Sequence, residues 1–236
     1  LLVVHQAGAD TPDKQMHNHY GVRVLTNGEV DAAYEYLNAH KEEFKLKQVG
    51  VPNFSHGSYS LYFLEPGTNG MEIECYETVL RKEREWGRLG GVHAPHWESP
   101  LAPERFPGRG YVPQGFTHGT LASSDIKVSE AFYRNALGLK TYRSYANVRY
   151  TKHPATKGFV VTAVRKEWRN YSENYRFTLT LESERVVLDK HRWLGDHAKK
   201  VGLSELGEIR DGNPAVSFLL RDVDRNCWEI SSPDDS

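Results

Sequence analysis

The stretch from Gly115 to Leu139, GFTHGTLASSDIKVSEAFYRNALGL, has the pattern of a strand that leads directly into a helix. The residues around His118 alternate in the way of a half-buried strand. In the second half Val128, Phe132 and Leu139 recur at helical spacing, which predicts that they share one side of a helix. The order of a strand and then a helix is therefore the first feature to look for elsewhere in the chain.

The same pattern occurs in two other places, so the chain contains three copies of one unit. The copies span residues 19–77, 115–166 and 174–233, and each continues from its helix into strand-like pieces separated by Gly, Pro and Asn. The order β-α-β-β-β predicts an α+β fold of repeated units, with curved mixed sheets around a cup and helices on the outer faces. The residues at helical spacing in the first copy are Val30, Ala33, Tyr34 and Leu37.

Residues 79–112 separate the first copy from the second and are rich in Gly, Pro and charge, which indicates an interdomain linker. We therefore expect an N-terminal module at residues 1–78 and a C-terminal module of two repeats at residues 113–236. The N-terminal module then lacks its first half, and a fourth repeat would precede Leu1. His93 and His96 fall in the linker and are expected on a surface loop.

The composition is that of an ordinary globular protein, with 39% hydrophobic and 26% charged residues. The formal net charge is −1 and no segment concentrates Lys or Arg, so we expect no nucleic-acid partner. No apolar run approaches the roughly 20 residues that a bilayer requires, so we expect no membrane span. Two cysteines, Cys75 and Cys227, indicate a reducing cytoplasmic compartment rather than a disulfide scaffold.

Three phrases carry a resemblance to a known superfamily. They are HGTLASSDIKVSEAFYRNALGL at 118–139, YFLEPGTNGMEIE at 62–74 and LRDVDRNCWEI at 220–230. Together with the repeat order, they resemble the vicinal oxygen chelate superfamily, which includes glyoxalase I, bleomycin-binding proteins and extradiol ring-cleaving dioxygenases. The two-domain extradiol dioxygenases are the most similar. The resemblance implies that two β-α-β-β-β units pair into one curved sheet that wraps a metal site.

The resemblance also implies where the metal ligands lie. The first strand of a repeat supplies a His, and a last strand supplies a Glu in a phrase similar to D-P-D-G-N-x-x-E. His19 and His118 fit the first position, and Glu72 and Glu229 fit the second. Two neutral imidazoles and one carboxylate form a facial triad, which suits Fe(II), with Mn, Zn or Ni as alternatives. The remaining coordination positions would be open to substrate oxygens and O2.

Further candidates lie close to the first set of ligands. Tyr62 precedes Glu72 by ten residues, and His56 lies shortly before Tyr62. The resemblance implies that His56 handles protons and that Tyr62 hydrogen-bonds a substrate oxygen. Glu74 shares a strand face with Glu72 by the period of two, so it is the alternative ligand. His17 is expected to face away from His19.

The third repeat departs from this pattern. Alignment of NHYGVRVL with NYRFTLTL places Tyr175 where His19 lies, and the residue ten before Glu229 is Leu219 rather than a tyrosine. Two arrangements can then complete a triad. An unseen repeat can supply a second His to His19 and Glu72, or the second visible repeat can bring His118 beside them.

The function that the resemblance implies is an Fe(II)-dependent extradiol-type dioxygenase, which uses O2 to open a catechol-like aromatic ring. The alternatives are a non-catalytic protein that binds a small aromatic ligand, and a glyoxalase-like isomerase or lyase. Metal content distinguishes them, since iron favours the first, no metal the second, and zinc or nickel the third. An unpaired half-cup would expose an apolar sheet face, so we also expect a homo-oligomer.

Overall fold

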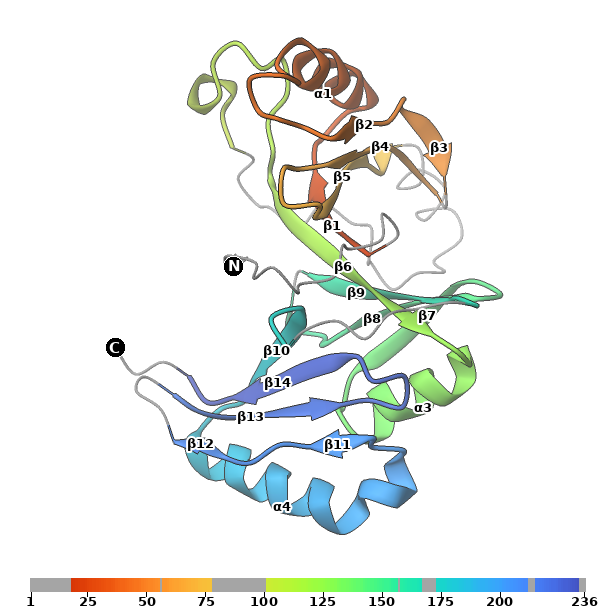
Figure 1. Ribbon diagram of the computed structural model, residues 1–236, viewed down its shortest axis with the longest axis vertical. Helices are drawn as coiled ribbons and strands as arrows, with labels where there is room; N and C mark the ends of the chain where they lie inside the picture. The colour runs from red at the N-terminus through yellow and green to blue at the C-terminus, as the bar shows by residue number, and fades with distance from the viewer. Residues whose placement is uncertain are drawn as a thin grey trace. The chain divides into compact units, whose positions relative to one another are not determined.

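The computed structural model describes residues 18–55, 57–77, 101–156, 158–166, 173–211 and 215–233. Within these ranges the three predicted repeats are present (Figure 1). The first repeat comprises β1 (His19–Arg23), α1 (Asn27–Ala39), β2 (Gln48–Val49), β3 (Asn53–Ser55), β4 (Ser58–Leu64) and β5 (Gly70–Cys75). The second comprises β6 (Gly115–Ser123), α3 (Ile126–Asn135), β7 (Lys140–Tyr145), β8 (Val148–Lys152) and β9 (Phe159–Val164). The third comprises β10 (Arg176–Thr180), α4 (Glu184–Val201), β11 (Glu205–Leu206), β12 (Arg210–Asp211), β13 (Val216–Arg221) and β14 (Cys227–Ser231).

The three α-helices α1, α3 and α4 each begin at a side chain that caps free amide groups. Thr26 accepts a hydrogen bond from the Glu29 amide, and the Glu29 carboxylate accepts one from the Thr26 amide, which is a complete capping box for α1. Asp125 caps α3 and Ser183 caps α4. The long helix α4 ends at Gly202, whose φ of 76° is the left-handed conformation that glycine adopts at low cost.

The strands form two sheets. The larger has the order β2-β4-β5-β1-β6-β9-β8-β7, with β3 paired to β4, and the smaller has the order β10-β14-β13-β11, with β12 paired to β13. In the larger sheet β1 lies between β5, which is parallel to it, and β6, which is antiparallel. Segments about 50 and 100 residues from β1 in the sequence are therefore its direct neighbours.

The two faces of the first-repeat sheet differ in chemistry. Its α1 side is a hydrophobic core, in which Ile73 of β5 and Leu61 of β4 pack against Val30, Ala33 and Leu37 of the helix. Because side chains alternate along a strand, the residues of β5 on either side of Ile73 point to the opposite face. These residues are the glutamates at positions 72 and 74, both fully buried. The core thus fixes the strands, and the other face carries the charged groups.

The chain divides into two compact units, one of residues 1–120, 142–146 and 154–161, the other of residues 121–141, 147–153 and 162–236. The first unit therefore includes residues 115–120 of β6. In the second unit α4 packs on β13 and β14 (Figure 1). Val187 and Leu194 of the helix are buried, as are Phe218 and Trp228 of the two strands. Much of the expected linker at 79–112, namely residues 79–100, lies outside the described residues.

One detail of α3 differs from the expectation. Val128 is 47% exposed, and the buried residues of this helix are Ile126, Ser129, Phe132 and Tyr133. Leu139 is buried but follows the helix, which ends at Asn135. The apolar spacing of the sequence therefore indicated the helix correctly and its buried side only in part, because two polar groups are buried there through hydrogen bonds. No helix of the described segments combines the length and apolar character needed to cross a membrane.

Candidate metal centre

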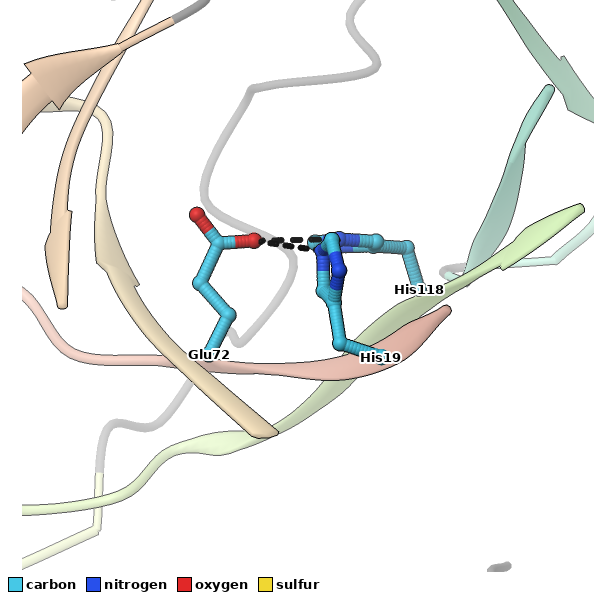
Figure 2. A group of neighbouring side chains, drawn as sticks. All are labelled: His19, Glu72 and His118. Atoms are coloured by element: carbon cyan, nitrogen blue, oxygen red, sulfur yellow. Dashed lines mark hydrogen bonds and ion pairs between the residues drawn. The ribbon is translucent and has the colours of Figure 1, made fainter. Parts of the chain in front are cut away.

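Three strands bring His19, Glu72 and His118 to one place on the charged face (Figure 2). In the sheet, Gly21 of β1 pairs with Glu72 of β5 on one side and with His118 of β6 on the other. His19 lies two residues before Gly21, so it points to the same face. Since Gly21 carries no side chain, the three longer side chains converge over it.

The donor atoms of these residues form a small triangle. Nε2 of His19 lies 3.0 Å from Oε2 of Glu72, Nε2 of His118 lies 3.3 Å from the same oxygen, and the two Nε2 atoms are 3.2 Å apart. All three residues are buried, with 7% or less of their surface exposed. The two imidazole rings meet edge to face at 86°.

This triangle fits a divalent metal ion. A ligand distance of about 2.1 Å puts two donors about 3.0 Å apart at a right angle and about 3.4 Å apart at the tetrahedral angle. The observed sides of the triangle fall in this range. In addition, neither carboxylate oxygen of Glu72 accepts a hydrogen bond of good geometry from the described residues, although the residue is fully buried. A buried carboxylate that lacks hydrogen-bond donors is costly unless a cation lies beside it. The group could therefore hold a metal.

The charges around the triangle favour a carboxylate and a cation. Burial alone would raise the pKa of Glu72, but the imidazoles of His118 and His19 outweigh burial and hold it well below its usual range. Burial would lower the pKa of His118, but the carboxylates of Glu74 and Glu72 outweigh burial and raise it to about 9. Without a metal, a proton on His118 supplies the positive charge that the two glutamates require.

Two aromatic side chains line the triangle. The ring of Tyr62, from β4, meets the His19 ring edge to face with 5.0 Å between centroids. Phe159, from β9, stacks on His118 with 5.1 Å between centroids and 16° between planes. Tyr62 pairs directly with Glu72 across β4 and β5, so the ten-residue spacing in the sequence corresponds to a cross-strand contact.

The structure thus brings together three of the four predicted ligands, in the second of the two arrangements considered above. Glu229 is in neither this group nor any other three-donor group among the described residues. Its carboxylate instead accepts hydrogen bonds from Arg176 at 2.8 Å and Thr178 at 3.0 Å. His56 lies outside the described residues, so its assignment to proton transfer stays a prediction. His17, His93 and His96 also lie outside them.

The register of the third repeat corrects one alignment. Glu229 pairs with Thr178, just as Glu72 pairs with Gly21, so the position two residues earlier is Arg176 and not Tyr175. Tyr175 is buried, and alternation puts it on the other face of the strand. A one-residue shift in a strand exchanges its faces, which is why aligning the two sequences by their shared Asn selected the wrong residue.

Several residues of the site had no signal of their own in the sequence. Gly21, Thr117 and Phe159 resemble ordinary strand residues. Only the sheet order, with β6 between β1 and β9, shows that they surround His118. Glu74 was considered as a ligand, but its carboxylate lies 2.5 Å from the Thr117 hydroxyl and 3.4 Å from Arg23. Both contacts are made by Oε1, which is therefore directed to other protein groups.

No family model matches the sequence, and no curated protein matches it either. Among solved structures, a Bacillus subtilis protein described as a "putative dioxygenase" is similar over 93% of this chain, with a TM-score of 0.59 and 15% identity. The match covers 62% of that protein, so this chain spans less than two thirds of its length.

Two shorter proteins are similar to about half of the chain. One is a lactoylglutathione lyase from Agrobacterium tumefaciens, with 15% identity, coverage of 52% of this chain and 96% of its own, and a TM-score of 0.41. The other is a glyoxalase/bleomycin resistance protein/dioxygenase family enzyme from Burkholderia phytofirmans, with 14% identity, coverage of 49% and 96%, and a TM-score of 0.41. At these identities the likeness concerns the fold alone. The predicted α+β fold of β-α-β-β-β repeats is confirmed.

Proposed function

We propose that the chain is a metal-dependent dioxygenase of the extradiol type, which uses iron(II) and O2 to open the ring of a catechol-like aromatic. The observation that carries the proposal is the donor set. Two imidazoles and one carboxylate converge within 3.3 Å of one another in a buried position. This set, with positions left open for other donors, is typical of non-haem Fe(II) oxygenases.

The charge of the site suits a substrate with two neighbouring oxygens. Neutral His19 and His118 with ionised Glu72 sum to −1, so a divalent ion leaves a net charge of +1. The adjacent Glu74 and Arg23 cancel each other. A positive, buried site favours the ionised form of a catechol. Bound iron(II) would supply the redox and Lewis-acid chemistry through which O2 reacts with the ring.

The protein side chains would orient the substrate and handle its proton. Tyr62 is a candidate for hydrogen bonding to a substrate oxygen, because its ring lies against His19. Phe159 covers one face of the His118 ring and limits the access of water to it. We propose a small aromatic substrate on these grounds.

The test is O2 uptake by anaerobically purified, iron-loaded protein with a panel of catechols. The proposal expects uptake coupled to the absorbance of a ring-opened product, and no uptake by the His19→Ala variant. Tyr62→Phe should keep its iron and slow turnover by a factor of about 10² to 10⁴, since the variant loses a positioned hydroxyl. Stoichiometric zinc or nickel without O2 uptake would support the isomerase instead, and absence of any metal would support a binding protein.

A further inference from the structure

The imidazole of His118 is enclosed by residues that do not themselves belong to the metal triangle. Gly21 lies directly beneath the ring, and a Cβ at this position would overlap Cε1 and Nδ1 of His118. Thr117 Oγ1 lies 3.1 Å from Nδ1 of His118, and Oε1 of Glu74 lies 3.5 Å from the same nitrogen. The ring therefore has its Nε2 toward the triangle and its Nδ1 toward a hydroxyl and a carboxylate.

A β-bulge brings Thr117 to this side of the sheet. Gly21 pairs with His118 and the next residue, Val22, pairs with Phe116, so Thr117 is the extra residue on β6. In a regular strand neighbouring side chains point to opposite faces, but a bulge redirects one of them. As a result, the side chains of Thr117 and His118 both reach Glu74.

The hydrogen bonds of Thr117 determine which nitrogen of His118 carries the proton. A threonine hydroxyl has one hydrogen to donate, and its possible acceptors are Oε1 of Glu74 at 2.5 Å, the carbonyl of Gly21 at 3.2 Å and an unprotonated Nδ1 of His118 at 3.1 Å. If the hydroxyl donated to Nδ1, no hydrogen would lie between Oγ1 and the ionised Glu74 carboxylate, although these two oxygens make the shorter contact. The geometry therefore favours donation to Glu74, with Nδ1–H of His118 donating to Oγ1, and in the neutral ring this leaves the lone pair on Nε2.

Glu74 holds the end of this chain of hydrogen bonds. Its side chain is fully buried, and Oε1 also lies 3.4 Å from Nη2 of Arg23. Arg23 itself is 3% exposed and lies 4.5 Å over the ring of Tyr76. The guanidinium and the carboxylate compensate each other in a position where neither alone would be stable.

We propose that Thr117, placed by the β-bulge, and Glu74 are positioning residues, which hold the neutral His118 ring in the Nδ1-protonated form whose Nε2 binds the metal. The inference rests on the metal site of the proposed function and not on the identity of the reaction. Hydrogen-bonded partners of ligating histidines commonly contribute 10- to 100-fold to metal affinity.

The experiment is a cobalt(II) titration of the whole chain, followed by the visible spectrum of the bound ion. Thr117→Val removes the hydroxyl at nearly constant shape, and Thr117→Ser restores it. Thr178→Val is the matched control, because it removes an equivalent Thr–Glu hydrogen bond, at Glu229, in the third repeat. Circular dichroism and thermal melting establish that each variant is folded.

We expect Thr117→Val to bind cobalt about 10- to 100-fold more weakly with an altered spectrum, whereas Thr117→Ser and Thr178→Val stay within about threefold of the unmodified chain. Equal binding by Thr117→Val and the unmodified chain would overturn the inference, as would a serine variant as weak as the valine variant. If the unmodified chain binds no cobalt, the metal site and this inference both fail. If it binds cobalt as expected but its iron form opens no catechol, only the proposed reaction fails.

Discussion

Arg176 occupies in the third repeat the position that His19 occupies in the first. Both residues lie two positions before the residue that pairs with the glutamate of the last strand. The Arg176 guanidinium lies 2.8 Å from Glu229 and, with Thr178, holds the pKa of that carboxyl below its usual value against the effect of burial. In the third repeat the Arg176 guanidinium thus takes the place of the His19 imidazole. Because this cation already compensates the charge of Glu229, the carboxylate needs no metal ion.

Protonation of His118 should make metal binding depend on pH. Burial would lower its pKa, but the glutamates raise it to about 9, so below pH 9 a metal must displace a proton from the ring. We expect release of about one proton per metal at pH 7, and an apparent affinity for zinc that rises about tenfold per unit between pH 6.5 and 8.5. Calorimetry in buffers of different ionisation enthalpy measures both quantities. An affinity independent of pH would contradict this charge assignment.

The proximity of His19 and Glu72 could be expected from the sequence, because both belong to one repeat and fit the ligand positions of the resemblance. Tyr62 was singled out by the same resemblance and by its spacing of ten residues from Glu72. The role of these residues as ligands stays a prediction. Whether His118 joins Glu72 was open, because it depends on the pairing of β1 with β6, about 100 residues apart in the sequence, and no local pattern records such a pairing. The alignment of Tyr175 with His19 was wrong for a related reason, since only the register of a strand fixes which face each residue occupies.

At the scale of elements, the loops before β5 and β14 explain why the N-x-x-E phrase recurs. Asn69 donates its backbone and side-chain N–H groups to Glu65, and Asn226 donates both to Asp222. The residue before each Asn has a positive φ, 65° at Thr68 and 63° at Arg225. The phrase therefore specifies a loop that starts the last strand. It does not by itself indicate a ligand, and this is why Glu229 fitted the pattern.

The close pairing of β1 and β6 should make Gly21 sensitive to substitution. Gly21→Ala places a methyl group where the His118 ring lies, so the ring must move and metal affinity should fall by at least tenfold. Gly28→Ala, in the first turn of α1, is the matched control, because the nearest atom to the added Cβ is the hydroxyl oxygen of Thr26, 3.9 Å away. Equilibrium titration with cobalt(II) compares the two. Equal affinity in both variants would show that the ring tolerates displacement.

The loop before β14 should also contribute to the pH dependence of stability. Burial raises the pKa of Asp222 to about 6, although amide groups of Asn226 and Asp224 oppose burial. A raised carboxyl pKa gives stability that is full below about pH 3.8 and is lost as pH rises through about 6.

Chemical denaturation of the unmodified chain and of Asp222→Asn isolates this effect. The free energy of unfolding of the unmodified chain, relative to the variant, should fall by roughly 2–3 kcal/mol between pH 4 and pH 7. The variant also loses acceptor capacity toward Tyr133 and Trp228, which lowers its stability by an amount independent of pH. A constant difference between the two proteins across this range would disprove the assignment.

At the scale of the whole molecule, the repeat order was predictable because each repeat has its own helix pattern and its own Gly, Pro and Asn residues between strands. In the first helix Val30, Ala33 and Leu37 are buried as expected, so the period identified both the helix and its face. The expectation of an oligomer rested on an apolar face in the unpaired repeat. The face of β10 and β14 instead carries Arg176 and Glu229 in an ion pair. The oligomer stays a prediction, which light scattering would test.

The central claim is that residues of two different repeats form one metal site. The most direct measurement is the metal content of the chain after anaerobic reconstitution with iron(II), for the unmodified protein and for His19→Ala, Glu72→Gln, His118→Ala and Glu229→Gln. We predict about one iron per chain in the unmodified protein and in Glu229→Gln, and substantial loss in the other three, because each of them lacks a donor of the triangle. Iron retained by His118→Ala and lost from Glu229→Gln would contradict the account and place the metal in the third repeat.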